Sequence, residues 1–336
     1  MSEPFLSHHT LSGWRSMLRS DNPSRPLIPA REYKQMDEAA RYKYDEERFD
    51  HHSEVRTIHT PLIDRLSKDI QLLLISNRRQ VGARQGLLVS GEPTTGKTTA
   101  LLAVGAAAEH RIRARTPGAG GAPVAYISLP PQASPKNIAL AVIRFFGVHP
   151  PDRTPFPELM HSAAGLLSGN RTRLLIIDEV HNLSLRNRAA AEASDFLKHL
   201  AECTEATPLY GGIDLQRHGL FDDARGRQIA GRFALVRAAP FAYSNEADRT
   251  LWTNLVGAFE SHLLLFNHRK GTLTRANRYL FTRTGGHIGS LANLIRKAAI
   301  AAMLDGTERI DKERLEATST DWAAESSTAT RIRLVR

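Results

Sequence analysis

The chain is organised around the stretch Gly91-Glu92-Pro93-Thr94-Thr95-Gly96-Lys97-Thr98-Thr99. A short apolar run, Leu87-Leu88-Val89, precedes it, and an alanine-rich helical stretch follows it. Strand, glycine-rich loop and helix in this order are the pattern of a phosphate-binding loop. Glycine at both ends lets the backbone curl, so that its N–H groups and the N-terminus of the following helix surround the phosphates of a nucleotide.

This loop supplies the candidate nucleotide-binding residues. We expect Lys97 to reach the terminal phosphates, and Thr98 to offer its hydroxyl oxygen to a phosphate-bound magnesium ion. A glycine-rich turn before a helix, without a ligand, is the alternative interpretation. The residues expected to bind ATP are Gly91, Glu92, Pro93, Thr94, Thr95, Gly96, Lys97, Thr98 and Thr99.

A second motif, Leu174-Leu175-Ile176-Ile177-Asp178-Glu179, is an apolar run that ends in two carboxylates. Such a run is typical of a parallel strand buried on both faces. Its end should lie beside the phosphate-binding loop, so we expect Asp178 to bind ATP and hold Mg²⁺, directly or through water. Glu179 would then orient and deprotonate the water that attacks the γ-phosphate. A strand end followed by a solvated acidic turn is the alternative.

Composition sets the outer limits of the interpretation. The 336 residues can bury one large core and a smaller one, and 41% of them are hydrophobic, as in ordinary globular proteins. The single cysteine, Cys203, excludes intrachain disulfides and a cysteine-rich metal site. No apolar run approaches membrane-spanning length, and the N-terminus lacks the apolar core of a signal peptide. We therefore expect a cytoplasmic protein without a membrane partner.

The formal charge of +10 suggests a polyanionic partner, and nucleic acid is the candidate. A generally arginine-rich proteome would produce the same balance. One local basic segment, Arg111 to Arg115, follows the alanine-rich helix and precedes a glycine-rich loop. It fits a contact with the DNA backbone and fits equally well a cationic helix C-terminus that compensates the helix dipole.

The remaining pattern divides the chain into four parts. Residues 1–55 are polar and are punctuated by Pro23, Pro26 and Pro29, which indicates an N-terminal arm with one or two short helices in its second half. Residues 56–243 alternate apolar runs with helical periods, which predicts a doubly wound α/β core. Residues 244–320 keep only helical periods and form a predicted helical lid, and residues 321–336 are a predicted mobile tail. Further strands are expected at Val124–Leu129, Pro208–Ile213 and Phe233–Ala238, and a helix is expected to start at Ser134-Pro135.

Together these features resemble the AAA+ ATPase family, whose core sheet has the strand order 5-1-4-3-2 and carries a C-terminal helical lid. Softer matches over about residues 40–318 resemble the TniB/TnsC-type ATPases of bacterial DNA transposons. These matches are Asp178-Glu179-Val180-His181-Asn182-Leu183, Gln228-Ile229-Ala230-Gly231-Arg232-Phe233, Gly285-Gly286-His287-Ile288-Gly289-Ser290-Leu291 and the aromatic, histidine-rich segment from Tyr42 to Ile63.

The resemblance implies a role for Arg232 and two departures from the family pattern. Arg232 matches the arginine finger that reaches the γ-phosphate held by a neighbouring subunit, and an arginine that caps the preceding helix is the alternative. After the fourth strand, Asp214 stands where the family usually has a threonine or asparagine that senses the phosphate. The lid has glycine where many relatives have a second sensing arginine, which leaves Arg283 or Arg296 as substitutes.

The resemblance also implies a function. ATP bound between subunits would drive assembly of a homo-oligomer or filament, a heptamer or hexamer, on double-stranded DNA. This assembly would recruit or activate a transposase, together with a targeting adaptor, and ATP hydrolysis would disassemble it. Two alternatives are open: an AAA+ protein of the replication-initiator or helicase-loader type, and a signalling switch that uses ATP to recruit proteins and never touches DNA.

Overall fold

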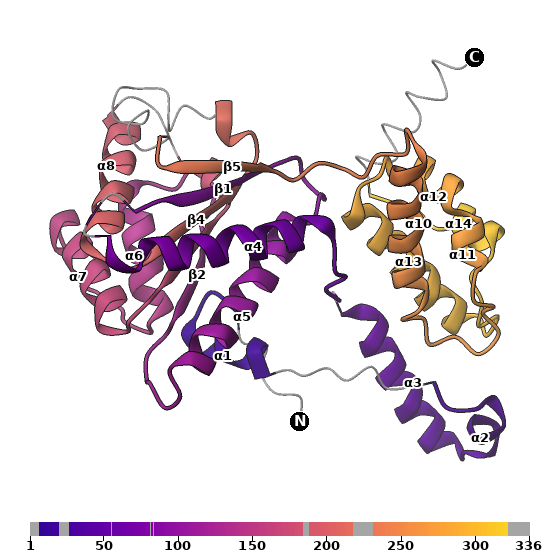
Figure 1. Ribbon diagram of the computed structural model, residues 1–336. Helices are drawn as coiled ribbons and strands as arrows, with labels where there is room; N and C mark the ends of the chain where they lie inside the picture. The colour runs from indigo at the N-terminus through magenta and orange to yellow at the C-terminus, as the bar shows by residue number, and fades with distance from the viewer. Residues whose placement is uncertain are drawn as a thin grey trace. The chain divides into compact units, whose positions relative to one another are not determined.

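The computed structural model describes residues 7–19, 27–54, 56–80, 82, 84–183, 188–217 and 231–321 (Figure 1). Its contacts divide the chain into two compact units. The first unit comprises Met1–Asp21, Pro61–Pro93 and Lys97–Ala238, and the second comprises Asn22–Thr60, Thr94–Gly96 and Ala239–Arg336.

The first unit is built on a five-stranded parallel sheet with the order β2-β3-β4-β1-β5. This is the predicted order 5-1-4-3-2 viewed from the other edge, so the expected α/β sheet is confirmed. Four strands are buried along most or all of their length, which explains their continuous apolar runs, and only the edge strand β5 is partly exposed. The strands are β1 (Gly86–Ser90), β2 (Val124–Ser128), β3 (Leu174–Asp178), β4 (Thr207–Gly212) and β5 (Phe233–Arg237).

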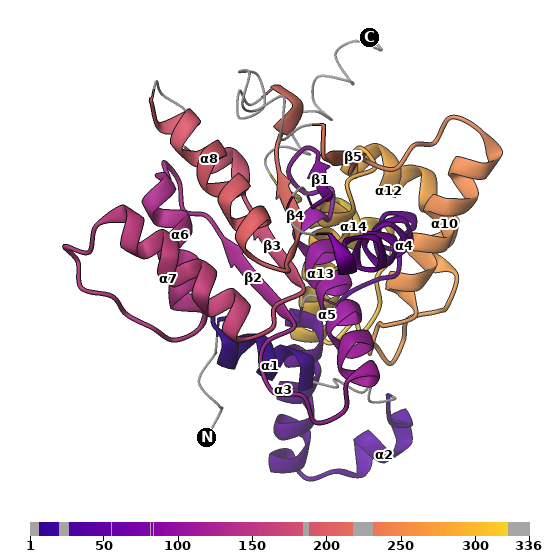
Figure 2. The same ribbon diagram turned by 60° about the vertical axis from the view of Figure 1, so that its left-hand side comes forward.

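Helices cover both faces of this sheet. The long helix α5 and its neighbour α4 pack on one face, and α6, α7 and α8 pack together on the other (Figure 2). Gly105 lets α5 approach closely, because a Cβ atom there would lie 2.8 Å from Ile176 and 2.9 Å from Trp14. The helices are α1 (Leu11–Arg19), α4 (Pro61–Ser76), α5 (Lys97–Arg115), α6 (Pro135–Phe145), α7 (Phe156–Gly169) and α8 (Arg188–Cys203), with short 3₁₀ turns η1 (Asn77–Arg79), η2 (Val180–Asn182) and η3 (Leu215–Arg217).

The helix start predicted at Ser134-Pro135 is confirmed. Ser134 caps α6 by accepting a hydrogen bond from the Asn137 backbone N–H, and the Asn137 side chain accepts one from the Ser134 N–H. Proline at the first helical position loses no hydrogen bond, since that N–H has no partner within a helix. The predicted tail lies largely outside the described residues, which include only Asp321 of it.

The second unit is helical, as predicted for the lid. Its core includes Trp252, Leu280 and Leu294, which are fully buried. Asn245 begins α10 with a reciprocal cap, since Asn245 and Asp248 each accept a hydrogen bond from the other's backbone N–H. The helices are α2 (Ala30–Gln35), α3 (Glu38–Ser53), α10 (Glu246–Glu260), α11 (Thr272–Arg275), α12 (Asn277–Thr284), α13 (Ile288–Leu304) and α14 (Lys312–Ala317).

In the segment expected to be an N-terminal arm, one helix forms that was not predicted, and two helices form in its second half, where one or two short helices were expected. Helix α1 belongs to the first unit, where Trp14 is fully buried and its indole N–H donates to the buried Glu109 Oε2 at 2.9 Å. Helices α2 and α3 belong to the second unit, where Arg48 is 1% exposed. A polar composition does not reveal such contacts, because a single aromatic or a paired charge can be buried without an apolar period around it.

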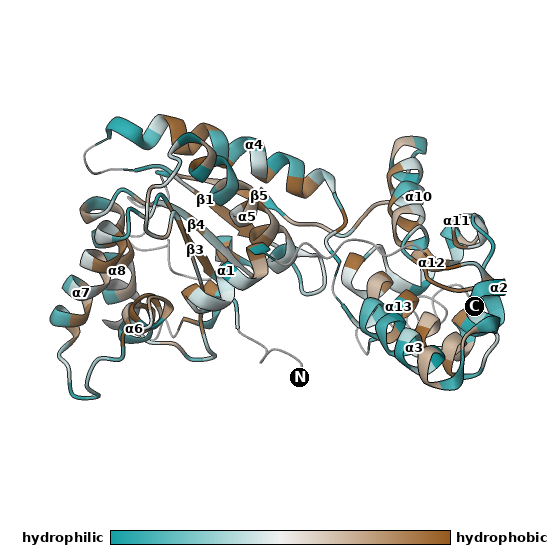
Figure 3. Cartoon of the chain, turned by 90° about the horizontal axis from the view of Figure 1, so that it is seen from below, coloured by the Kyte–Doolittle hydropathy of each residue, from teal (hydrophilic) through white to brown (hydrophobic). Residues whose placement is uncertain are grey.

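Hydropathy follows this architecture. In Figure 3 the strands are mainly hydrophobic, and hydrophilic residues lie on the outward faces of the helices and in the loops. Within the part of the chain that the structure describes, no helix is both long and apolar enough to cross a membrane.

Candidate functional site

The glycine-rich loop joins β1 to α5, and its backbone needs glycine at two places. Gly96 has φ +83°, in the left-handed region that glycine adopts without strain, and Thr94 shares this region at φ +62°. Gly91 has no room for a side chain, because a Cβ atom there would lie 2.0 Å from the Ala238 carbonyl oxygen. Helix α5 begins at Lys97, so the loop leads directly into a helix N-terminus, where backbone N–H groups attract phosphate oxygens.

Lys97 is 6% exposed and lies among carboxylates. Its Nζ donates a 2.6 Å hydrogen bond to the Glu92 carbonyl oxygen within the loop. Burial lowers the pKa of this ammonium group below its ordinary value, and the charges of Glu179, Asp178 and Glu92 oppose that shift. A phosphate oxygen could therefore take the place of the Glu92 carbonyl and give the buried cation an anionic partner.

Asp178, at the end of β3, meets the start of α5. Thr98 Oγ1 donates to Asp178 Oδ2 at 2.8 Å, and the Tyr126 hydroxyl donates to the same oxygen at 3.0 Å. Burial and this carboxylate together raise the pKa of Tyr126 well above its ordinary value, so the phenol remains a donor. Gly211 on β4 leaves space for the group, because a Cβ atom there would lie 2.8 Å from Asp178 Oδ1.

The donor set around Asp178 fits Mg²⁺. This ion prefers hard oxygen ligands and usually binds through one or two carboxylates, substrate phosphates and water. The Thr98 hydroxyl and the Asp178 carboxylate already lie within hydrogen-bond distance. Among the described residues there is no group of three or more His, Cys, Asp or Glu side chains that could form an all-protein metal site. The residues present therefore suit a metal that arrives with a nucleotide.

Glu179 follows Asp178 in a left-handed conformation, at φ +58° and ψ +35°, and begins the turn η2. Its Oε2 lies 3.3 Å from His181 Nε2. The other ring nitrogen, Nδ1, accepts a 3.2 Å hydrogen bond from the Ile213 N–H just after β4. Because Nδ1 is an acceptor, the neutral ring carries its hydrogen on Nε2, the nitrogen that lies beside the Glu179 carboxylate.

His181 therefore connects Glu179 to the end of β4, a link that the sequence did not predict. The available signal was the pair Gly211-Gly212. A Cβ atom on Gly212 would lie 3.3 Å from His181 Nδ1. In the same way, a Cβ atom on Gly211 would lie too close to Asp178. Both glycines at the end of β4 thus make room for polar groups of the site.

The N-terminal segment contributes aromatic groups beside Tyr126. His9 stacks on the Tyr126 ring at 5.6 Å between centroids, and Trp14 stacks on it at 6.2 Å. Burial lowers the pKa of the His8 imidazole, and the Asp178 charge partly offsets this shift. These residues belong to the segment expected to be an arm, and their position near the acidic motif was not predictable from its polar composition.

Arg232 lies at the end of the sheet where β1 begins, whereas the glycine-rich loop of the same chain lies at the end where β1 finishes. The Arg232 carbonyl oxygen accepts the Gly86 N–H at 3.0 Å, where β1 begins, whereas the loop follows Ser90, where β1 ends. Five strand residues separate the two ends by about 16 Å. Arg232 Nη1 lies 3.4 Å from Glu202 Oε1, and the helix that Arg232 could cap falls outside the described residues, as do Gln228, Ile229 and Ala230 of its motif.

Two of the three sensor candidates, Asp214 and Arg283, have other partners. Asp214, with φ +45°, accepts a hydrogen bond from Gln216 Nε2 at 3.2 Å. In the second unit, Arg283 donates to the Tyr279 hydroxyl and the Thr318 carbonyl, while Arg296 lines a 70 Å³ pocket beside His51 and His52.

The lid glycine Gly289 has a specific contact inside the second unit. Its N–H donates to the Thr94 carbonyl at 2.8 Å, and a Cβ atom on Gly289 would lie 3.0 Å from Thr94. The second glycine-rich motif thus contributes a close backbone contact to the loop residue Thr94.

Comparison with known proteins agrees with this fold. Residues 79–215 match the model of a family described as an AAA domain. None of the curated proteins matches the chain. Similar solved structures include Aeropyrum pernix ORC2 in ADPNP–ADP complexes, with TM-score 0.60, 13% identity, and coverage of 82% of this chain and 73% of that chain.

Two further structures are similar. Aeropyrum pernix ORC1, solved in complex with DNA, has TM-score 0.55 and 17% identity and covers 93% of this chain and 69% of that chain. Drosophila ORC bound to DNA has TM-score 0.53 and 14% identity and covers 91% of this chain and 72% of that chain. At such identities the likeness concerns the fold alone, which is the P-loop AAA+ fold.

Proposed function

We propose that this chain is an ATPase that assembles on duplex DNA in its ATP-bound state. The observation that carries the proposal is the hydrogen bond between Thr98 and Asp178, which joins the start of α5 to the end of β3 with Lys97 and Glu179 beside it. A hydroxyl, a carboxylate, a buried cation and a second carboxylate at the end of a glycine-rich loop are the groups that phosphoryl transfer from ATP to water requires.

Each group has a role in this proposal. The loop N–H groups and Lys97 bind the β- and γ-phosphates, and Glu179 accepts a proton from the attacking water. His181 positions Glu179 by donating Nε2–H to its carboxylate. Thr98 and Asp178 would hold Mg²⁺, which when bound neutralises phosphate charge.

The proposed site is completed between subunits. Arg232 lies at the edge of the sheet opposite its own loop, about 16 Å away along the strands. Its guanidinium group therefore suits a γ-phosphate held by a neighbouring copy better than one in its own chain. We propose a homo-oligomer, a closed ring of six or seven subunits or a filament, that forms when ATP is bound.

The proposed partners are duplex DNA and a transposase with its targeting adaptor. The net charge of +10 supports a polyanionic partner. The TniB/TnsC-like motifs support a transposition role, in which the ATP-bound assembly presents target DNA and hydrolysis releases it. The working compartment in this proposal is the cytoplasm.

A second candidate, a replication initiator or helicase loader, is favoured by a different observation. The similar solved structures include ORC proteins, two of them solved with DNA. The two candidates differ in sequence preference, since an initiator binds particular sites whereas a transposition regulator of this type binds duplexes with little preference. A protein-recruiting switch would bind no DNA at all.

Binding of labelled duplexes tests these proposals. The purified chain should shift duplexes of several sequences at low salt with a non-hydrolysable ATP analogue, and should not shift them with ADP. Absence of any shift would contradict DNA binding and favour the protein switch, whereas strong preference for one sequence would favour the initiator. Stimulation of a DDE transposase encoded beside this gene would support the transposition role.

A further inference from the structure

A basic pocket of 520 Å³ lies in the first unit, where the C-terminal ends of α4 and α5 meet. Its lining also includes Thr207, at the start of β4, so it lies at the edge of the sheet opposite the glycine-rich loop. We call it the arginine pocket, after the arginines in its lining. They are Arg78, Arg79, Arg111, Arg115 and Arg173.

Most of this positive charge has no carboxylate partner among the residues that the structure describes. Arg173 forms an ion pair with Glu205, the single carboxylate in the lining. No described carboxylate lies within ion-pair distance of the other four arginines, which come from η1 and from the last turns of α5. Among the described residues, about four of the positive charges on this concave surface are therefore uncompensated, and like charges repel each other unless an anion is bound.

Helix dipoles do not account for these charges. A helix C-terminus carries about half a negative charge, so the C-terminal ends of α4 and α5 together supply a charge of about −1. The four arginines without a carboxylate partner supply about +4. An excess of about three positive charges remains. This magnitude separates the two interpretations left open for residues 111–115: compensation of the dipole needs one arginine, whereas an anion site uses several.

The arginines of that segment also differ in their partners. Arg113 contacts the buried Glu109 carboxylate at 2.7 Å and the Gly121 carbonyl, and it is not part of the lining. Arg111 and Arg115 line the pocket instead. Helical spacing explains the split, because residues four apart share a face and the residue between them points elsewhere.

A buried arginine next to the pocket adds to its positive potential. Arg84 is 6% exposed, and its Nη1 donates to the Ala201 carbonyl at 3.3 Å. Its Nε is buried without a hydrogen-bond partner among the described residues. Burial lowers the pKa of Arg84 from its ordinary value, Glu205 opposes this shift, and Arg173 adds to it, which places Arg84 within electrostatic range of the pocket.

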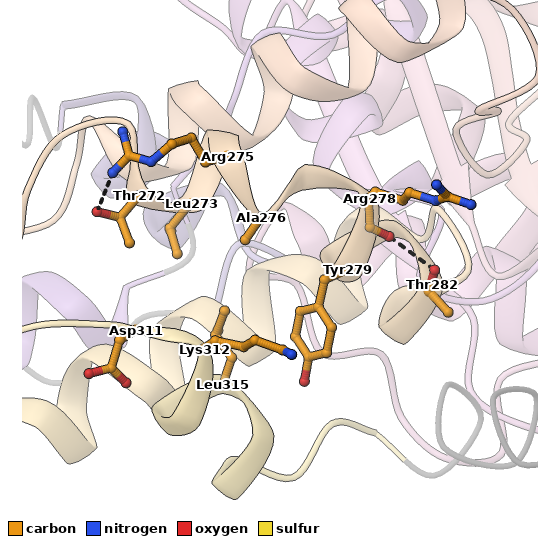
Figure 4. A pocket seen from close by; sticks show the side chains of 10 residues that line it. All are labelled: Thr272, Leu273, Arg275, Ala276, Arg278, Tyr279, Thr282, Asp311, Lys312 and Leu315. Carbon is orange, nitrogen blue, oxygen red and sulfur yellow. Dashed lines mark hydrogen bonds between the residues drawn. The ribbon is translucent and has the colours of Figure 1, made fainter.

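A pocket of 620 Å³ in the second unit provides a contrast (Figure 4). Its lining contains three cations, Arg275, Arg278 and Lys312, and two of them contact neighbouring side chains. Lys312 pairs with Glu316 at 3.6 Å and lies 6.0 Å from the centre of the Tyr279 ring, and Arg275 contacts the Thr272 hydroxyl. Asp311 stands in the same lining. This pocket has no comparable excess of charge.

We propose that the arginine pocket binds the phosphate backbone of duplex DNA. This inference rests on the proposed function and adds the location of the contact. Guanidinium groups match phosphate geometry with two parallel hydrogen bonds, and several of them side by side bind a polyanion without reading its bases. Because the pocket lies at the far edge of the sheet from the loop, DNA at the arginines leaves the subunit's own nucleotide site free.

Salt dependence of DNA binding tests the pocket. The double variant Arg111→Gln with Arg115→Gln removes two phosphate contacts, so the slope of log K against log salt concentration should become shallower by about 2. Its matched control is Arg65→Gln with Arg153→Gln, which removes the same charge from exposed positions outside the pocket. The control should change the slope by less than about 0.5, and both double variants should hydrolyse ATP at the wild-type rate without DNA.

Three outcomes would overturn the assignment. If both double variants lowered the slope equally, total charge and not the pocket would determine binding. If the pocket variant bound DNA with an unchanged slope but failed to oligomerise, the pocket would receive an acidic protein surface. If the wild-type chain bound no duplex with ATP, the proposed function would fail as well, and this result differs from a failure of the pocket alone, in which the wild type still binds.

Discussion

The two units of this protein both bury charged side chains, but these side chains differ in the number of acceptors that they contact. In the second unit, Arg48 is 1% exposed, and its guanidinium donates to the Leu264 carbonyl at 2.7 and 3.0 Å and to Asp45 at 2.9 Å, and also pairs with Glu308. In the first unit, Lys97 is nearly as buried, and among the described residues its ammonium group donates to the Glu92 carbonyl alone.

This difference distinguishes buried charged side chains that stabilise the fold from those that bind a ligand. A buried cation with a full set of acceptors holds the fold together, and removal of one partner leaves a costly unpaired charge. A buried cation with a single neutral acceptor, beside two carboxylates and a glycine-rich loop, is arranged for a ligand that comes and goes. The following experiments test this contrast, from the largest expected effect to the smallest.

Replacement of the loop lysine should have the largest effect. Lys97→Ala should abolish ATP binding, because the phosphates lose their buried cation. Glu179→Gln should keep ATP affinity but lower turnover by about 10² to 10⁴-fold, since the amide cannot accept the proton. Nucleotide titration and steady-state turnover measure the two effects. Equal loss of affinity in both variants would contradict the proposed roles.

Arg232→Ala should leave ATP binding nearly unchanged and lower turnover by about 10³-fold or more, because the guanidinium acts on a neighbour's γ-phosphate. Loss of its exposed contact with Glu202 accounts for less than about 1 kcal/mol.

Mixing variants provides the control for Arg232. Arg232→Ala subunits have an intact loop and Lys97→Ala subunits have an intact arginine, so a mixture should recover part of the activity. A mixture that associates but stays inactive, or normal turnover by Arg232→Ala alone, would show that the role between subunits is wrong.

In the second unit, Arg48→Ala should lower the free energy of unfolding by about 3–5 kcal/mol, since Glu308 and the Leu264 carbonyl lose their buried partner. Denaturant unfolding followed by circular dichroism measures the loss. Arg309→Ala is the matched control, because its pair with Asp311 is exposed and should contribute at most about 1 kcal/mol. Similar losses in both variants would break the contrast between the units.

The stability of the second unit should also depend on pH. Burial lowers the pKa of His52 to about 3, and His51 and Arg48 add to the shift. The unfolded chain, with an imidazole pKa near about 6.5, therefore takes up this proton first as pH falls. The contribution of His52 to the free energy of unfolding is therefore fully present above about pH 6.5. At about pH 5 the free energy of unfolding should be about 2 kcal/mol lower.

Substitution checks this assignment. His52→Gln keeps an acceptor for the Leu264 N–H and should flatten the pH dependence of the melting temperature between about pH 5 and 7. His149→Gln removes an exposed imidazole from the first unit and should leave that dependence unchanged. An unaltered slope in His52→Gln would exclude His52 as its source.

The smallest effect concerns His181. His181→Ala should lower the turnover number about tenfold without changing ATP affinity, because Glu179 loses the N–H that orients it. His181→Gln retains an N–H donor at a similar reach and should recover most of the turnover. If His181→Gln and His181→Ala lower turnover equally, or if ATP affinity falls as much as turnover, His181 does not position Glu179.

Sequence alone predicted the sheet and the central part of the candidate site. Continuous apolar runs predicted the buried parallel strands, and a glycine-rich loop between strand and helix predicted where phosphates would bind. Parallel strands end at the same edge of a sheet, so the order of the motifs along the chain was enough to place Lys97, Thr98 and Asp178 together. The strand order is confirmed and Thr98 meets Asp178 across 80 residues, whereas phosphate binding stays a prediction. Each motif is a local pattern, and the parallel order of the strands brings the ends of the motifs together.

Tertiary structure decided everything that depends on distant partners. Trp14 finds Glu109 across 95 residues and Arg48 finds Leu264 across 216, so polar segments that look like an arm become parts of two cores. His181 meets Ile213 only because β3 and β4 are neighbours, and the arginine pocket exists only because the ends of α4 and α5 come together. Local periodicity indicates which face of an element is apolar, but it does not indicate which charged side chains from separate elements will share a partner or lack one.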